Sequence, residues 1–101
     1  PKLFECKAVW SRTKESAAKL ATQLGAEPYG GDADLVVLLA RDDVDAVIIS
    51  LPLDVQPKYV IQALEAGKKV LSEKPIAATV DEGAKLLSTY KEKYSDIQWS
   101  I

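Results

Sequence analysis

Residues 46–51 read AVIISL, an almost continuously apolar and β-branched run. Such a run is typical of a strand buried on both faces of a parallel sheet, whereas a half-exposed hairpin strand alternates apolar and polar residues. Pro52 ends the run, because proline has no amide hydrogen to offer a sheet ladder. The stretch therefore predicts a parallel sheet covered by helices.

The rest of the chain alternates between strand-like and helix-like patterns. Short strands are predicted at 6–10, 26–29, 69–72 and 97–101, in addition to the run at 46–51. Helices are predicted at 14–24, from Asp32 past Leu39, from Pro57 to the stop at Gly67, and from Val80 to about Tyr94. Strands and helices in this order are typical of βαβ crossovers, so the predicted fold class is α/β with a mainly parallel sheet.

Helix-capping residues and inward faces can also be predicted. Asp32 is placed to cap the second helix, and Thr79 with Glu82 matches a capping box for the last one. Apolar spacing predicts that the following residues face inward: Leu35, Leu38 and Leu39 in the second helix, Val60, Ile61 and Leu64 in the third, and Leu86, Leu87, Tyr90 and Tyr94 in the fourth.

Composition excludes several classes of function. The 101 residues fit one domain, and a net charge of −2 gives no case for a nucleic-acid or membrane partner. The chain has no histidine, which removes Ser-His-Asp catalysis and most zinc sites, so no metal site is expected. The single cysteine, Cys6, is expected to pack as a small apolar residue on a strand. No run approaches the ~20 apolar residues of a membrane span and no signal peptide is visible, so a cytoplasmic location is expected.

Polar residues follow three of the predicted strands. They are Ser-Arg-Thr at 11–13, Ser-Leu-Pro at 50–52 with a loop through Gln56, and Glu-Lys-Pro at 73–75. In open parallel sheets, ligands bind beyond the carboxyl ends of the strands. We therefore expect all three segments to lie along one edge of the sheet and to form a binding site.

Each segment also has a purely structural interpretation. Ser11 and Thr13 could cap the following helix, and Pro52 could simply end a strand. Arg12 could be a solvated charge, or it could hold a phosphate through forked hydrogen bonds if the ligand is a nucleotide.

The charges after the fourth strand have two interpretations as well. Glu73 and Lys74 could form an exposed ion pair worth less than ~1 kcal/mol. They stand between a buried strand and Pro75, however, and a lysine in such a place can donate a proton or stabilise a developing alkoxide.

Two stretches carry a resemblance to a known family. They are VDAVIISLP at 44–52 and ALEAGKKVLSEKPIAATVDEGAKL at 63–86. They resemble the nucleotide-binding domain of the Gfo/Idh/MocA oxidoreductases, the relatives of glucose-fructose oxidoreductase, inositol dehydrogenase and the rhizopine-catabolism proteins. The resemblance implies a doubly wound Rossmann domain joined to a larger α/β substrate domain. It also implies reversible hydride transfer between NAD(P) and a hydroxyl or carbonyl, usually on a sugar, polyol or related compound.

The resemblance also implies roles for individual residues. Lys74 becomes the catalytic lysine, near the reacting hydroxyl and the nicotinamide, and Glu73 contacts the nicotinamide ribose or organises the loop. Pro75 is expected to set the backbone, with a cis Lys74–Pro75 bond as one way of doing so. The loop expected to pass along the cofactor contributes Ser50, Leu51, Pro52 and Gln56.

The end of the first strand bears on the choice of cofactor. Ser11 and Arg12 match members of the family that hold the adenosine 2′-phosphate, so the resemblance favours NADP over NAD. An aspartate at this place would accept the 2′-hydroxyl and repel the phosphate.

The chain departs from the family pattern in three ways. It has no G-x-G-x-x-G, it ends at Ile101 where a substrate domain is expected, and it carries Leu53 and Gln56 where the family often has asparagine and histidine. We therefore expect residues 1–101 to be a fragment of a longer two-domain protein, in which a homo-oligomer could form through the second domain. The absent first strand would belong between the strands at 6–10 and 46–51, and without it both would have an unpaired edge. A nucleotide-sensing regulatory protein without turnover is one alternative on the same fold. Another is that residues 1–101 by themselves are an α/β fragment with no independent activity.

Overall fold

The computed structural model describes residues 5–101. Strands and helices alternate along this range: β1 (Ala8–Ser11), α1 (Lys14–Leu24), β2 (Glu27–Gly30), α2 (Gly31–Leu39), β3 (Ala46–Ile49), α3 (Gln56–Glu65), β4 (Lys69–Ser72), α4 (Val80–Lys93) and β5 (Trp99–Ser100). The strand pairs β1–β2, β3–β4 and β4–β5 are all parallel, which confirms the α/β class. The chain divides into two compact units, one up to Val44 and one from Asp45 onward, and each is described by itself.

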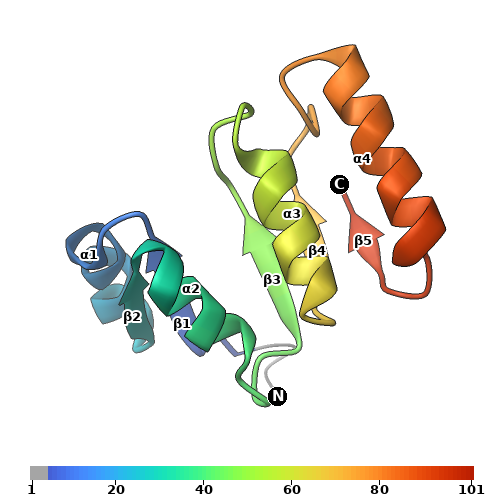
Figure 1. The fold of residues 1–101 in the computed structure, drawn as a ribbon. Helices are drawn as coiled ribbons and strands as arrows, with labels where there is room; N and C mark the ends of the chain where they lie inside the picture. The colour runs from blue at the N-terminus through green and yellow to red at the C-terminus, as the bar shows by residue number, and fades with distance from the viewer. Residues whose placement is uncertain (1–4) are drawn as a thin grey trace. The chain divides into compact units, whose positions relative to one another are not determined.

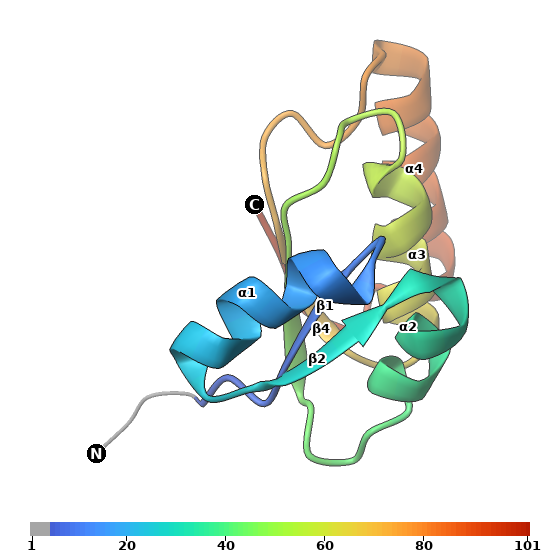
Figure 2. The same ribbon diagram turned by 90° about the vertical axis from the view of Figure 1, so that its left-hand side faces the viewer.

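The first unit is a two-stranded ribbon, β1–β2, with α1 and α2 on opposite sides of it (Figures 1 and 2). Helix α1 begins and ends where its sequence predicts. The Thr13 hydroxyl accepts a hydrogen bond from the Ser16 amide at 3.3 Å, and Gly25 ends the helix in the left-handed region at φ 67°. Ala17 and Ala21 are buried against the ribbon, and their small side chains let the helix approach closely.

The start of α2 differs from the prediction that Asp32 caps it. The helix begins at Gly31, so Asp32 already lies inside the first turn. The neighbouring carboxylate acts instead, because Asp34 accepts a hydrogen bond from the Gly30 amide at 3.0 Å. Gly30 also lies against the start of α1, where an added Cβ would be 2.1 Å from the Lys14 nitrogen. The end of β2 and the start of α1 are thus fitted backbone to backbone.

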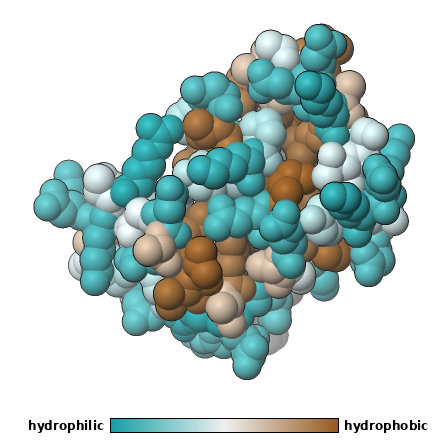
Figure 3. Space-filling model, in the orientation of Figure 1, coloured by the Kyte–Doolittle hydropathy of each residue, from teal (hydrophilic) through white to brown (hydrophobic). Residues whose placement is uncertain are grey.

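Helix α2 is apolar on more than one side. Leu35, Leu38 and Leu39 are buried, as their spacing predicts. Val36 and Val37, on the outer side, are 61% and 57% exposed. Figure 3 shows apolar surface over this helix.

The second unit is a three-stranded parallel sheet in the order β3–β4–β5, with α3 and α4 on the same face (Figure 2). Pro57 lies in the first turn of α3, and the Thr79 hydroxyl accepts from the Glu82 amide at 3.1 Å to begin α4. Both starts are as predicted. The core between helices and sheet contains Ile49, Val60, Ala63, Leu64, Val70 and Leu86.

The stretch AVIISL was predicted to be buried on both faces of the sheet, and this prediction is wrong for the face opposite α3 and α4. Strand β3 ends at Ile49 rather than at Leu51, and Ile48 is 73% exposed. Leu71 on β4 is 44% exposed for the same reason, since successive side chains of a strand point alternately to the covered and to the uncovered face. The continuous apolar run contains residues that could be buried on both faces of a sheet, whereas the helices of this unit cover only one face.

Strand pairing leaves two edges open. Among the described residues β1 pairs only with β2, and β3 pairs only with β4 on its one side. These are the two strands that the sequence analysis expects to flank a further strand.

Three smaller predictions are wrong. Cys6 is exposed and precedes β1, so it does not pack on a strand. Leu87 is 40% exposed, because the buried face of α4 runs through Gly83 and Leu86. The last strand covers only Trp99–Ser100.

Candidate functional site

The register of the sheet brings two polar residues together at the carboxyl ends of β3 and β4. Ile49 is paired with Ser72, so the next residues along each strand, Ser50 and Glu73, leave the sheet side by side. The Ser50 hydroxyl donates a hydrogen bond to Glu73 Oε1 at 2.9 Å. The Glu73 carboxylate is therefore oriented by the neighbouring strand end, and within residues 5–101 it forms no ion pair with Lys74.

Lys74 follows Glu73 in this loop and is exposed. It precedes a cis peptide bond to Pro75, as the sequence analysis proposed for this motif. Across the described part of the chain, the Lys74 ammonium has neither a hydrogen bond nor an ion pair. The lysine thus presents an uncommitted charge at the carboxyl end of a parallel strand, where ligands bind in folds of this kind.

Gln56 lies beneath the same loop. Its side chain is fully buried, and its Nε2 is 3.3 Å from each of three backbone oxygens, those of Glu73, Pro75 and Ile76. The orientation of the amide follows from these partners, because three carbonyls require a donor. Sequence reasoning placed Gln56 along a cofactor, whereas the structure places its side chain under the backbone of the Glu-Lys-Pro segment.

The turn between β3 and α3 places this glutamine. Leu51 is half-buried and Pro52 is exposed, and the Pro52 carbonyl accepts hydrogen bonds at 3.0 Å from the amides of both Val55 and Gln56. Pro52 lies beyond the end of β3 at Ile49, so it does not end the strand, and it helps instead to start α3 at Gln56.

A second anchor holds the end of β4 and was missed by sequence reasoning. The buried Ser72 hydroxyl accepts a hydrogen bond at 2.9 Å from the Trp99 indole on β5. The Trp99 ring meets Tyr90 edge to face at 5.2 Å, and the Tyr90 hydroxyl donates to the Ile97 carbonyl at 2.6 Å. No local pattern signals this set, because it joins residues that are far apart in the sequence. It fixes the residue immediately before Glu73.

Ser11 and Arg12 lie in the first unit, at the end of β1. Ser11 is the half-buried last residue of the strand, and Arg12 is exposed. Of the two hydroxyls that could cap α1, Thr13 is the one that does so. Arg12 has no ion pair or side-chain hydrogen bond in residues 5–101.

The other arginine of this unit is fully engaged. Arg41 lies 2.7 Å from carboxylate oxygens of both Glu27 and Asp43, and 3.0 Å from the Tyr29 hydroxyl. The hydrogen bond from Arg41 lowers the pKa of Asp43 from 3.8 to about 2. Arg41 thus ties β2 to the segment after α2 and is a structural residue, which separates its role from that of Arg12.

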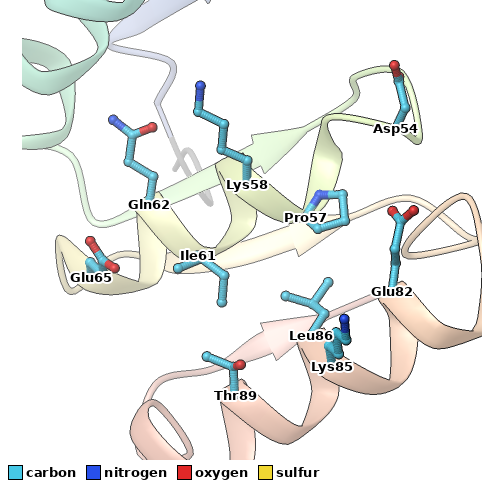
Figure 4. Close-up of a pocket in the computed structure, with 10 residues that line it drawn as sticks. All are labelled: Asp54, Pro57, Lys58, Ile61, Gln62, Glu65, Glu82, Lys85, Leu86 and Thr89. Atoms are coloured by element: carbon cyan, nitrogen blue, oxygen red, sulfur yellow. The ribbon is translucent and has the colours of Figure 1, made fainter.

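A groove of about 570 Å³ runs between α3 and α4 (Figure 4). Ile61 and Leu86 point toward one another across it, and Asp54 and Glu82 lie near one end. Its lining does not include Ser50, Glu73 or Lys74, so the polar residues of the strand ends form a separate feature.

Residues 5–101 contain neither a candidate metal site nor a candidate membrane-spanning helix. In residues 5–101, no three His, Cys, Asp or Glu side chains gather in a way that could hold a metal ion. None of the helices in this range combines the length and apolar character that crossing a membrane requires.

Comparison with known proteins places this arrangement in a family. A family model described as "Oxidoreductase family, NAD-binding Rossmann fold" matches residues 1–98. The chain is 36% identical over 91 residues to dTDP-3,4-didehydro-2,6-dideoxy-alpha-D-glucose 3-reductase of Actinomadura kijaniata, covering 90% of this chain and 26% of the relative. It is 44% identical over 87 residues to the enzyme of the same name from Streptomyces violaceoruber, covering 85% and 24%.

Comparison with solved structures supports the same family assignment. The crystal structure of KijD10, a 3-ketoreductase from Actinomadura kijaniata in complex with NADP and TDP-benzene, matches with a TM-score of 0.76 and 35% identity, covering 92% of this chain and 28% of that one. The chain thus spans about a quarter of the length of the relatives it matches. With a family match along almost its full length, this chain belongs to the Gfo/Idh/MocA oxidoreductases and carries their NAD-binding Rossmann fold.

Proposed function

We propose that this chain is the cofactor-binding part of a longer, NADP-preferring oxidoreductase. Its reaction interconverts a carbonyl and a hydroxyl on a sugar, a polyol or a related small compound. The observation that carries the proposal is the state of Lys74, whose ammonium is exposed and uncommitted while Ser50 holds Glu73 and Gln56 holds the loop backbone. Because Ser50 and Gln56 hold the residues around it, the free Lys74 ammonium is available to a ligand.

The residues present fit an NADP cofactor. Arg12 is an exposed guanidinium without an ion pair in the described range, and its planar fork suits a phosphate. Ser11 offers a hydroxyl beside it, and the residue directly after β1 is this arginine rather than a carboxylate that would repel a phosphate. At the other strand ends, the Glu73 carboxylate can accept a hydrogen bond from a ribose hydroxyl while Ser50 orients it. Leu51 and Pro52 supply the apolar side of the loop expected along the cofactor.

The chemical role proposed for Lys74 is that of a general acid. When bound, the cofactor supplies the hydride in the direction of reduction. The Lys74 ammonium then gives a proton to the carbonyl oxygen as negative charge develops on it, and the neutral amine takes the proton back in the direction of oxidation. A residue of this kind contributes roughly 10²–10⁴-fold to a rate.

The relatives guide the choice of substrate. Two of them are named as reductases of a dTDP-linked deoxysugar, and KijD10 was solved with NADP and TDP-benzene. These names give no support to a regulatory protein without turnover. We propose that the present protein acts on a carbonyl compound of the same general class, and does so in the cytoplasm, where NADPH is available.

The test is consumption of NADPH by the full natural chain that contains these residues. A panel of dTDP-linked ketosugars, free ketoses and oxidised polyols would be supplied with NADPH or NADH, and cofactor absorbance followed. We expect at least one compound to be reduced, and NADPH to be used in preference to NADH. Tight binding of NADPH without consumption on any compound would support the regulatory alternative instead.

A further inference from the structure

Gln56 is the most completely buried polar side chain among the described residues. It is 0% exposed, and Ser72 is the other buried polar residue. Burying an amide without partners destabilises a protein, so the partners of Gln56 show what its side chain does. All three of its Nε2 contacts, at 3.3 Å, go to backbone oxygens of a single short segment that contains Glu73 and Pro75 and ends at Ile76.

The hydrogen bonds of the Gln56 side chain are made from only one end of its amide. The other end of its amide, Oε1, is buried and has no hydrogen-bond partner within residues 5–101. A leucine of similar size would avoid the cost of burying that oxygen. It would also leave three inward-turned carbonyls without a donor, and that donor is what the glutamine provides.

The anchor itself is rigid. Gln56 is the first residue of α3, its own amide donates to the Pro52 carbonyl at 3.0 Å, and Pro57 follows it in the first turn. The donor therefore belongs to a helix start, whereas its acceptors belong to an irregular loop. Lys74 lies between two of the acceptor residues, Glu73 and Pro75, and has no anchor of its own in the described range.

We infer that Gln56 is a positioning residue for the reaction: its amide fixes the backbone from Glu73 to Ile76 so that the Lys74 ammonium is presented in one orientation. The inference rests on the proposed function of Lys74 and adds a residue that does not itself touch the cofactor. Without the donor, three carbonyls in part-buried hydrogen bonds lose their partner and the loop turns outward to reach water, which moves Lys74. A displacement of about 1 Å can cost a reaction 10²-fold.

The test compares Gln56→Leu with the wild type and with Gln62→Leu in the full natural chain. Gln62 is a matched control, because it stands on the same helix and lines the groove between α3 and α4 instead of the loop. The first readout needs no substrate. It is the rate at which sulfosuccinimidyl acetate acetylates Lys74, measured by peptide mass spectrometry with and without NADPH. The second is the NADPH dissociation constant, and the third is turnover.

We expect NADPH to protect Lys74 strongly in the wild type and in Gln62→Leu. In Gln56→Leu this protection should be largely lost and turnover should fall about 10²-fold, while the NADPH dissociation constant changes little. Full protection and normal turnover in Gln56→Leu would overturn the inference. Absence of protection in the wild type would instead refute the proposed function, so the two failures are distinguishable.

If Gln56→Leu does not fold, a second variant tests the positioning role of Gln56. In Gln56→Glu, the introduced carboxyl donates one hydrogen bond when protonated and none when ionised. This carboxyl faces carbonyl oxygens. The variant should therefore show Lys74 protection and turnover at low pH and, relative to the wild type, lose both as the pH rises. A pH profile parallel to that of the wild type would contradict the positioning role.

Discussion

The change Gly30→Ala tests how the end of β2 is fitted to the start of α1. An ideal Cβ at Gly30 would lie 2.1 Å from the Lys14 nitrogen, 2.5 Å from its Cα and 2.6 Å from the Thr13 carbonyl carbon. Gly30 has φ −144° and ψ 139°, which any residue adopts, so the penalty is purely steric. All three neighbours are backbone atoms, so no side chain can rotate away to make room.

The size of the effect follows from that geometry. Overpacking of a fitted site costs typically about 1–3 kcal/mol, and more where the neighbours cannot yield. We expect Gly30→Ala to fall at the upper end of this range or beyond. The strain can be relieved only by moving Thr13 and Lys14 away from β2, and these residues directly follow Arg12. Weaker NADPH binding should therefore accompany the loss of stability.

Gly25→Ala provides the control, because Gly25 has no atom within 4 Å of an added Cβ but adopts φ 67°. It should cost about 1–2 kcal/mol through the left-handed backbone alone and leave NADPH affinity unchanged. Urea unfolding gives the stabilities and fluorescence titration gives the affinities. A Gly30→Ala protein as stable as the wild type, or one destabilised with unaltered NADPH affinity, would refute the reasoning.

Three further predictions address the other elements. Gly83→Ala should stabilise the protein by roughly 0.5–1 kcal/mol, because Ala is the better helix former and its Cβ would meet Ile76 at an ordinary 3.6 Å; a loss of stability in urea would contradict this. Arg12→Ala should weaken NADP binding by about 1.5–3 kcal/mol and NAD binding far less, as measured by calorimetric titration; equal losses would remove the phosphate assignment. Because Arg41 lowers the pKa of Asp43 from 3.8 to about 2, this pair contributes stability above pH 4 that is lost as the pH falls toward 2. The stability gap between the wild type and Asp43→Asn should close over that interval, and a constant gap would argue against the pair.

Features governed by local chemistry were predictable from the sequence. Helix α1 begins and ends as its capping threonine and terminal Gly25 indicate, and α4 begins at its Thr79 cap. Strand β4 covers Lys69–Ser72, as predicted from its short apolar run and its flanking turn. In each case the signal lies within a few residues of the feature, so the sequence contains it directly.

Features governed by distant neighbours were not predictable. The exposure of Ile48 depends on which face α3 and α4 cover, and the apolar run that contains it is the same in either case. The role of Gln56 depends on carbonyls 17 to 20 residues away, and that of Ser72 on Trp99, 27 residues away. Asp34, and not Asp32, is the partner of Gly30 because the helix is capped at Gly30, two residues before the predicted cap at Asp32.

The most direct test of the account is the effect of Lys74→Ala on turnover and on cofactor binding in the full natural chain. Lys85→Ala serves as control, since Lys85 is exposed on α4 and lines the groove away from the strand ends. We predict that Lys74→Ala lowers kcat by roughly 10²–10⁴-fold with little change in the NADPH dissociation constant, and that Lys85→Ala matches the wild type. Turnover by Lys74→Ala at the rate of the wild type would contradict the account.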